Sequence, residues 1–195
     1  MKIFWRTLVL LMLCMGLFYG SEASNPKVLI KTELGDVTVE IFEKKAPVTA
    51  SNFLKYVDEG RFKGACFYRV VRMDNQSRSE IKIEVIQGGL RFTHQEKILS
   101  PIEHETTRKT GILHLDGIIS MARSKPGSAA SEFFICIGDQ PELDFGGMRN
   151  PDGQGFAAFG KVVAGMDIVK KIHQLPTDEQ MLVSRVAIHD VARLR

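Results

Sequence analysis

The sequence predicts a mainly β protein, built as an antiparallel barrel or sandwich with two helices. Short segments rich in Val, Ile, Phe and Thr recur along the chain, and clusters of Gly, Pro and Asn separate them. Only two segments place apolar residues at helical spacing. Many short strands combined with few helices are typical of antiparallel β folds. Periodicity leaves the choice between barrel and sandwich open.

The chain is expected to open with a hairpin over residues 28–32 and 37–41. In the second strand every other residue is apolar, the period of a strand with one buried face: Val37, Val39 and Ile41. Gly35 and Asp36 supply the turn between the two strands.

A helix is expected to begin at Pro47, because a first helical turn tolerates proline, and to end at Gly60. Its apolar residues fall at i, i+3, i+4 and i+7 and form one face: Ala50, Phe53, Leu54 and Val57. A second helix, over Met166–His173, is indicated by three apolar residues at similar spacing: Ile168, Val169 and Ile172.

The remaining elements are expected to be strands. Aromatic and β-branched residues between turn clusters predict them at residues 66–71, 81–87, 117–121, 132–135 and 157–163. The alternation of Val186 and Ile188 predicts the last strand.

Residues 1–23 have the pattern of a secretory signal peptide. Lys2 and Arg6 precede an apolar stretch over residues 7–19, and Ser21-Glu22-Ala23 is a small-x-small cleavage site. The apolar stretch is short for a membrane span. We therefore expect an exported protein, periplasmic rather than fully secreted, whose residues 24–195 form one domain. A retained anchor is the alternative.

The charge balance argues against nucleic acids and membrane surfaces as partners. The signal segment removes Lys2, Arg6 and Glu22, so 24 basic and 22 acidic side chains remain, a formal net charge of +2. No long basic run interrupts this balance. We expect a monomer that contacts no membrane after signal cleavage.

The sequence carries no recognisable metal, phosphate or serine-hydrolase motif. None of the histidines stands at metal-ligand spacing with a second ligand: His94, His104, His114, His173 and His189. The glycine-rich run 146–155 lacks the lysine that ends a phosphate-binding loop, and Ser120 lies in no nucleophile elbow. We expect neither a metal nor another cofactor.

Cys66 and Cys136 lie inside apolar strand segments. Export makes a disulfide between them possible. A cysteine in such a segment commonly acts as a small buried hydrophobe, so we expect two unpaired thiols.

One arginine stands among apolar residues in the segment Phe67-Tyr68-Arg69-Val70-Val71. A guanidinium stays ionised and presents a planar fork of donors, so on a strand that faces a pocket it can hold a carbonyl oxygen or polarise an amide. The alternative is an ion pair on the outer face of the strand.

Five further stretches accompany this segment. They are Ala46-Pro47-Val48-Thr49-Ala50-Ser51-Asn52-Phe53, Ile86-Gln87-Gly88-Gly89, Ser120-Met121-Ala122-Arg123 with Ser131-Glu132-Phe133-Phe134-Ile135-Cys136, and Phe159-Gly160-Lys161-Val162-Val163. In this order, and over about residues 28–191, the chain resembles the cyclophilin family of peptidyl-prolyl cis-trans isomerases. The resemblance implies a closed eight-stranded antiparallel barrel with a helix over each open end. It also implies an enzyme that assists the folding of proline-containing polypeptides without a cofactor.

The resemblance also assigns residues to the site. It places the family's catalytic arginine at Arg69, its pocket glutamine at Gln87 and its pocket phenylalanine at Phe134. Further substrate-binding positions are the proline slot at Val85 and Leu143, the peptide backbone contacts at Ala122 and Arg123, the wall at Phe156, and Glu132.

Three acidic residues depart from the family pattern. The aromatic and the methionine just before Ile86 become Glu84 and Val85, a glutamine becomes Glu132 and the pocket tryptophan becomes Glu142. We expect a thinner floor, an acidic rim that favours basic substrates, and weak binding of cyclosporin. In the alternative, Glu132 pairs with an arginine and the other two face solvent. The same residues favour a second function, a catalytically weak proline-peptide binding module or chaperone on this fold.

The connection over residues 72–80 is longer than the resemblance predicts. It reads as an inserted polar surface loop that reshapes one wall of the cleft. If Met73, Ile81 or Ile83 turns inward, it restores apolar volume lost at Glu84.

Overall fold

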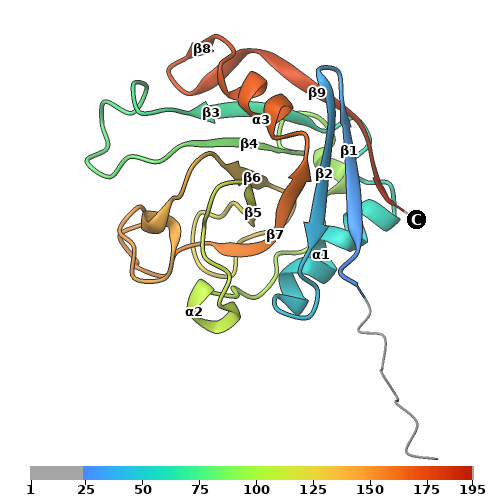
Figure 1. Cartoon of the computed structure of the whole chain (residues 1–195), viewed down its shortest axis with the longest axis horizontal. Helices are drawn as coiled ribbons and strands as arrows, with labels where there is room; N and C mark the ends of the chain where they lie inside the picture. Colours follow the sequence, from blue (N-terminus) through green and yellow to red (C-terminus); the bar gives the residue numbers. More distant parts are fainter. Residues whose placement is uncertain (1–23, 195) are drawn as a thin grey trace, which may run out of the picture.

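The computed structural model describes residues 24–194, which form a closed antiparallel β-barrel (Figure 1). Its eight strands are β1 (Lys27–Thr32), β2 (Gly35–Ile41), β3 (Cys66–Val71), β4 (Val85–Gly89), β5 (Ile118–Met121), β6 (Phe133–Cys136), β7 (Ala157–Ala164) and β9 (Met181–Arg193). They follow the order β1-β2-β7-β5-β6-β4-β3-β9, and pairing of β1 with β9 closes the ring. The two-residue strand β8 (Thr177–Asp178) pairs with β9 alone. The predicted eight-stranded closed barrel is confirmed, and the sandwich is excluded.

Burial alternates along the first two strands, β1 and β2. Val28 and Ile30 of β1 are fully buried, whereas Lys27 and Lys31 on either side of them are exposed. Ile30 lies opposite Val37 of β2 on one side and opposite Val191 of β9 on the other. One face of β1 and β2 therefore supplies the core, whereas β4, β5 and β6 are buried on both faces. The closed ring leaves β1 without a free edge.

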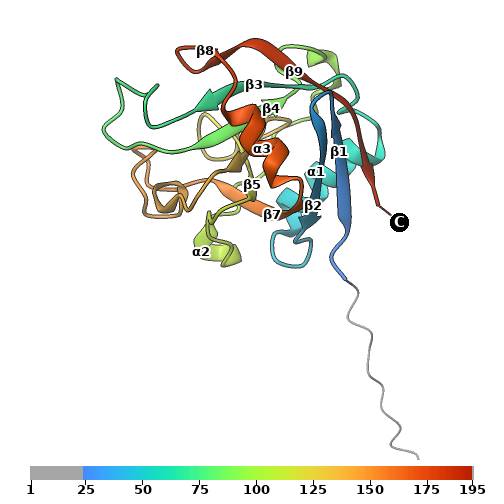
Figure 2. The same ribbon diagram turned by 45° about the horizontal axis from the view of Figure 1, so that its top comes forward.

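Three helices pack around the barrel (Figures 1 and 2). They are α1 (Pro47–Asp58), α2 (Thr107–Thr110) and α3 (Met166–His173). Both predicted helices are present, and α3 has the predicted bounds. The single turn of α2 was not predicted. Its four residues are too few to produce an apolar period, and only its cap residue Thr106, whose hydroxyl accepts a hydrogen bond from the backbone N–H of Lys109, marks its start.

An aromatic cluster joins α1 to the barrel. Phe53 of α1 contacts the rings of Phe62, Phe133 and Phe159 at centroid distances of 5.2, 5.7 and 5.0 Å. All four side chains are at most 1% exposed. The apolar face predicted for residues 50–57 is thus the face that packs on the sheet.

Strand β4 corrects the predicted element over residues 81–87. The strand begins at Val85 and continues to Gly89. Gln76 accounts for the late start, because its side-chain amide takes both backbone hydrogen bonds of Ile83: Oε1 accepts from the N–H, and Nε2 donates to the carbonyl. The backbone of Ile83 therefore has no group left for a neighbouring strand.

Cys66 and Cys136 are buried and unpaired, as expected. Burial raises the pKa of both thiols. The predicted signal peptide, residues 1–23, lies outside the described residues. Within residues 24–194, no helix has the length and apolar character that a membrane span requires.

Candidate active site

The side chains predicted to form the site line one cavity of about 500 Å³. The cavity is bounded by β3, β4, β6, the loop before β4 and the loop over residues 146–155. Its lining residues are Arg69, Ser79, Ile83, Val85, Gln87, Arg91, Ala122, Arg123, Phe134, Leu143, Arg149, Asn150 and Phe156. Eight of the nine predicted site residues are among them. The ninth, Glu132, lines an adjoining cavity of about 430 Å³ that shares Gln87, Arg91, Ala122 and Arg123 with the first.

A bulge in β3 directs two successive side chains to the same partner. The pairing of β3 with both β4 and β9 shifts register between Phe67 and Arg69. In a regular strand Tyr68 and Arg69 would point to opposite faces. Here both reach Gln87 on β4: Arg69 Nη1 donates to Gln87 Oε1 at 2.8 Å, and Gln87 Nε2 donates to the Tyr68 hydroxyl at 2.8 Å.

The chain of hydrogen bonds continues from Tyr68 to a carboxylate. The Tyr68 hydroxyl donates to Glu132 Oε2 at 2.5 Å, and Glu132 Oε1 accepts from the backbone N–H groups of Leu90 and Arg91. Burial raises the pKa of Tyr68, and the neighbouring carboxylate raises it further. Each side chain therefore donates to the next, from Arg69 through Gln87 and Tyr68 to Glu132. This order of donors and acceptors fixes the orientation of the Gln87 amide.

Glu132 also explains the glycine at position 89. Gly89 has φ +146°, and a side-chain carbon there would lie 2.5 Å from Glu132 Oε1. The carboxylate occupies the space that any other residue at position 89 would fill. Glu132 is accordingly tied into the wall and is not a free acid on the rim.

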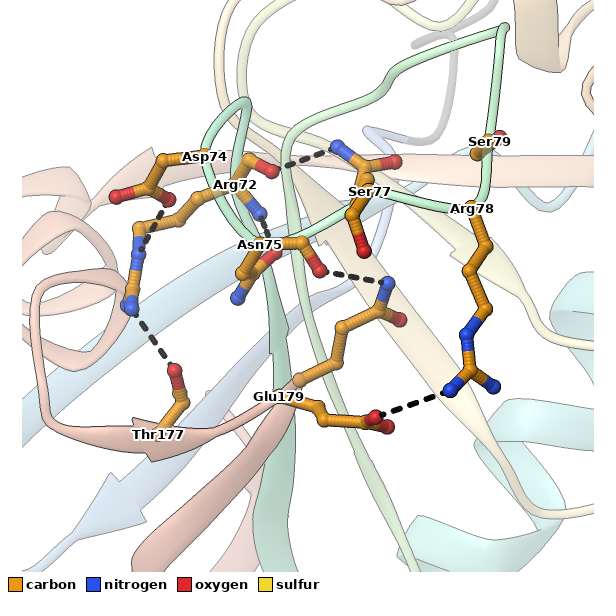
Figure 3. A pocket seen from close by; sticks show the side chains of 10 residues that line it. Arg72, Asp74, Asn75, Ser77, Arg78, Ser79, Thr177 and Glu179 are labelled. Atoms are coloured by element: carbon orange, nitrogen blue, oxygen red, sulfur yellow. Dashed lines mark hydrogen bonds and ion pairs between the residues drawn. The ribbon is translucent and has the colours of Figure 1, made fainter.

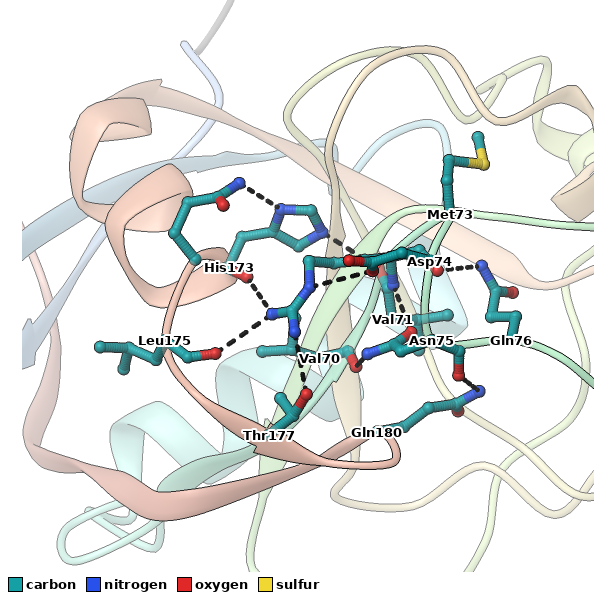
Figure 4. A network of polar contacts seen from close by, with 12 residues as sticks. Val70, Val71, Met73, Asp74, Asn75, Gln76, His173, Leu175, Thr177 and Gln180 are labelled. Carbon is teal, nitrogen blue, oxygen red and sulfur yellow. Dashed lines mark hydrogen bonds and ion pairs between the residues drawn. The ribbon is translucent and has the colours of Figure 1, made fainter.

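Gln180, which was not predicted, is the second partner of Arg69. It lies in the turn between β8 and β9, and its Oε1 accepts from Arg69 Nε at 3.1 Å and from Nη2 at 2.5 Å. Its Nε2 donates to the backbone carbonyl of Asn75 in the inserted loop at 3.3 Å (Figure 4). No local motif surrounds Gln180, and 111 residues separate it from Arg69, so the sequence offered no signal for this contact.

The two amide oxygens orient the guanidinium without neutralising it. Burial lowers the pKa of Arg69, and the nearby charge of Arg149 lowers it further, because both disfavour the cation. An arginine nevertheless remains protonated in a protein. Arg69 therefore presents a permanent, partly buried positive charge at the cavity.

The cavity floor is apolar. Phe134, 4% exposed, packs with Val71, Ile83, Val85, Cys136 and Leu143, and Phe156 stands edge-on to its ring at 5.3 Å. Of the residues proposed to replace the volume lost at Glu84, Ile83 does turn inward. Met73 does not, because 48% of its surface is exposed.

Behind Phe134 lies a polar series that resembles a hydrolase triad. His114 Nδ1 is 2.7 Å from Asp144 Oδ1, its Nε2 is 2.9 Å from Ser120 Oγ, and its ring stacks on Phe134. Ser120 is fully buried, so its hydroxyl cannot reach a bound substrate. The three side chains support the floor, in agreement with the absence of a nucleophile elbow in the sequence.

The cleft is basic, which contradicts the predicted acidic rim. Glu84 and Glu142 do not line the cavity, and Glu142 Oε2 instead accepts from the backbone N–H of Met148. Arg123 pairs with Asp152 at 2.7 Å and not with Glu132. The expected preference for basic substrates therefore loses its structural basis.

The inserted loop is anchored rather than merely exposed. Arg72 Nη1 donates to the carbonyls of His173 at 2.8 Å and Leu175 at 3.1 Å, and Nη2 donates to Thr177 Oγ1 at 2.9 Å (Figure 4). Gln76 is 2% exposed, so the prediction of a polar surface loop is wrong for this part of it.

On its outer side the loop borders a polar cavity of about 430 Å³, where Arg78 and Glu179 face each other at 3.8 Å (Figure 3). Both side chains are largely exposed, so this ion pair adds little stability. On its inner side Ser79, with Ile83 beyond it, forms one wall of the active-site cavity, as predicted.

Comparison with known proteins identifies the family. The model of the cyclophilin type peptidyl-prolyl cis-trans isomerase/CLD family matches residues 27–193. The chain belongs to the cyclophilin family. This cyclophilin is 36% identical to a peptidyl-prolyl cis-trans isomerase of Acinetobacter baylyi over 165 residues, which cover 83% of this chain and 80% of the relative.

Two other relatives agree. Peptidyl-prolyl cis-trans isomerase B of Escherichia coli is 34% identical over 167 residues, 84% of this chain and 94% of that protein. The crystal structure of a Cryptosporidium parvum cyclophilin matches the fold with a TM-score of 0.69 at 22% identity, covering 88% of this chain and 98% of that one. Within residues 24–194, no group of three or more His, Cys, Asp and Glu side chains is placed to hold a metal ion.

Proposed function

We propose that this cyclophilin accelerates the cis-trans rotation of X-Pro bonds in exported polypeptides, with Arg69 as the catalytic residue. The observation that carries the proposal is the uncompensated guanidinium of Arg69, held by Gln87 and Gln180 beside the apolar floor at Phe134. Relatives that are 34–36% identical carry the name peptidyl-prolyl cis-trans isomerase.

The reaction requires neither a broken bond nor a cofactor. Rotation meets a barrier of roughly 20 kcal/mol because the amide nitrogen shares its lone pair with the carbonyl. A catalyst must bind the twisted amide more tightly than either planar isomer. Reducing tens of seconds to about a millisecond takes roughly 6 kcal/mol of such preference. A fixed cation in a cavity that limits water stabilises the charge redistribution of the twisted amide.

The same cavity supplies the binding surface. Val85, Leu143 and Phe134 form the slot for the proline ring, and Phe156 closes its far side. Ala122 and Arg123 offer backbone groups to the extended peptide. A Cryptosporidium parvum cyclophilin has been crystallised in the presence of the dipeptide Ala-Pro, which supports a proline ligand here.

Export, a bacterial type of enzyme and a monomeric state belong to the proposal. The positive start, apolar stretch and cleavage site within residues 1–23 support export, with the periplasm as the destination. Isomerisation can limit the folding of exported chains, and outside the cytoplasm an enzyme that needs no ATP can serve them. The alternative of a weak binding module rested on three acidic residues in the cleft, Glu84, Glu132 and Glu142. None of them lines the cavity of about 500 Å³ that contains Arg69 and Phe134, which we call the proline cavity.

The test compares residues 24–195 with the variants Arg69→Ala and Arg69→Lys. We expect the wild type to accelerate relaxation of an X-Pro peptide strongly. Arg69→Ala should lower kcat/KM by at least about 100-fold, and Arg69→Lys should recover little, since an ammonium lacks the planar fork. Equal rates for wild type and Arg69→Ala would remove Arg69 from the mechanism. Peptide binding without acceleration would favour the binding module.

A further inference from the structure

Four arginines from four separate segments border the proline cavity, and no acidic residue within positions 24–194 does. Arg69 comes from β3, Arg91 from the segment after β4, Arg123 from the segment after β5 and Arg149 from the 146–155 loop. The chain after residue 23 has a formal net charge of only +2. The positive charge is therefore concentrated in the cleft and does not reflect a basic surface in general.

Three of the four guanidiniums have no carboxylate partner among the described residues. Only Arg123 is neutralised, by Asp152. Arg69 is held by amide oxygens, Arg91 lies over the ring of Phe92 at 5.4 Å, and Arg149 donates through Nη1 to Ser79 Oγ and to the carbonyl of Ile81. Neutral partners position these side chains and leave their charges to act on a ligand.

The unpaired arginines lie toward different parts of the cleft. Arg91 lines both the proline cavity and the adjoining cavity, whereas Arg149 lines the proline cavity alone. Beside Arg149, the side-chain nitrogen of Asn150 is buried without a hydrogen-bond acceptor in the described part of the chain. An oxygen of a ligand could supply that acceptor.

We propose that the cleft selects X-Pro peptides that carry a carboxylate close to the proline, and that Arg149 and Arg91 are the specificity-determining residues. This inference rests on the proposed function, because it assumes that the same cavity binds the substrate. A carboxylate next to the proline brings its negative charge between the unpaired guanidiniums. A lysine at that position brings a second positive charge into a partly buried cationic site.

The first measurement uses peptides with acetylated and amidated ends, so that only one side chain differs. Glu, Gln or Lys is placed directly before the proline in one series and directly after it in another. Both kcat/KM for isomerisation and Kd for binding are measured. We expect Glu to exceed Gln by about fivefold at low ionic strength, the factor that corresponds to about 1 kcal/mol, and Gln to exceed Lys. Raising the salt to about 1 M should bring the ratios toward one.

Variants assign the preference to residues. Arg149→Gln and Arg91→Gln should each reduce the Glu-to-Gln ratio, and Arg149→Lys should retain most of it. The ratio is taken within one variant, so a general loss of activity does not change it. Lys31→Gln is the matched control, since it removes one positive charge from an exposed position on β1 and should leave the ratio unchanged.

The outcomes separate the two proposals. Turnover of all peptides with equal kcat/KM and Kd overturns the selectivity and leaves the isomerase intact. Tighter binding of Glu peptides without turnover overturns the proposed function and supports the selectivity. Absence of both turnover and binding overturns both. The ligand carboxylate could also come from the C-terminus of a peptide, and a further peptide with a free carboxylate at its C-terminal proline tests this. A preference for that peptide alone assigns recognition to the chain end and overturns side-chain selectivity.

Discussion

At Arg69 a permanent positive charge is oriented by two amide oxygens, although a carboxylate would bind it more tightly. A carboxylate would compensate the charge that the twisted amide needs, so neutral partners suit catalysis. Gln87 is itself fixed by Tyr68 and, through it, by Glu132. Apart from Arg69, the Gln180 side chain has one hydrogen-bond partner among the described residues, the Asn75 carbonyl of the inserted loop.

The substitution Gln180→Ala tests whether this second amide positions Arg69. Loss of the acceptor for Nε and Nη2 should allow the guanidinium to swing, so we expect kcat to fall about tenfold with little change in KM. Gln180→Glu keeps an acceptor and should retain the orientation. A stopped-flow isomerisation assay supplies both constants. Asp178→Ala, an exposed change in β8, is the control, and an equal loss in that variant would point to a general disturbance of the turn.

Glu142 carries a prediction about inhibitors. In the family resemblance this position holds the tryptophan on which cyclosporin relies, and here its carboxylate accepts a hydrogen bond from the backbone N–H of Met148. We expect weak inhibition by cyclosporin and at least about tenfold stronger inhibition of Glu142→Trp, because an aromatic side chain buries a large apolar area. Inhibition titrations measure both. Submicromolar inhibition of the wild type would contradict the alignment of Glu142 with that tryptophan.

Local motifs predicted most of the residues that line the proline cavity, because neighbours on paired strands reach the same site. Arg69 and Gln87 stand opposite each other in the register of β3 and β4. The pairing of Glu132 with an arginine, considered as an alternative, is wrong, because Glu132 accepts from the Tyr68 hydroxyl and nothing near it in the sequence reveals that partner. Gln180 and Arg149 were missed for the same reason. Their partners are distant in the chain, and only the closed barrel brings them together.

Among the elements, the inserted loop differs most from its prediction. Its polar composition indicated an exposed turn, yet Arg72, Asn75 and Gln76 use their side chains to satisfy backbone groups of the loop and its neighbours. These residue types commonly replace missing backbone partners in a loop. The same hydrogen bonds explain why the strand predicted over residues 81–87 begins only at Val85.

Arg72 is expected to control how firmly this loop forms the cavity wall. In Arg72→Ala, two carbonyls and one hydroxyl lose a charged donor, and each such bond is worth about 1.5–3 kcal/mol at most. We expect faster amide hydrogen exchange over residues 75–83 and a several-fold lower kcat/KM. Arg78→Ala removes the same side chain from a position that is 92% exposed and should change neither quantity. Unchanged exchange in Arg72→Ala would show that Asn75 and Gln76 suffice to hold the loop.

At the scale of the whole molecule, the closed ring of strands determines where charge collects. The overall balance of acidic and basic residues is nearly even, and the sequence pattern placed acids at the rim. The structure instead directs Glu132 into the wall and Glu142 to a backbone N–H, while arginines from four segments meet at the cavity. Strand periodicity predicted an antiparallel β fold and the family resemblance predicted the barrel, but the direction of each long side chain depends on partners that only the closed fold supplies.

The pH dependence of stability should reveal one such side chain, the half-buried His104. Its Nε2 lies 3.1 Å from the carbonyl of Gln154, and its Nδ1 is buried without a partner among the described residues. Burial lowers the pKa of His104 below its ordinary value of 6.5. The charge of Arg123 lowers it further, while the Gln154 carbonyl and Asp152 act in the opposite direction.

The sign follows from proton uptake. Below pH 6.5 the unfolded chain takes up a proton at His104 that the folded state resists, so the free energy of unfolding falls as the pH decreases. One proton contributes a slope of at most about 1.4 kcal/mol per pH unit. Denaturant titrations between about pH 7 and pH 5 should therefore show a steeper loss for the wild type than for His104→Gln. Parallel plots of the unfolding free energy against pH for wild type and His104→Gln would mean that His104 takes up its proton as readily in the folded protein as in the unfolded chain. The ring would then not be held neutral between Arg123 and the 146–155 loop.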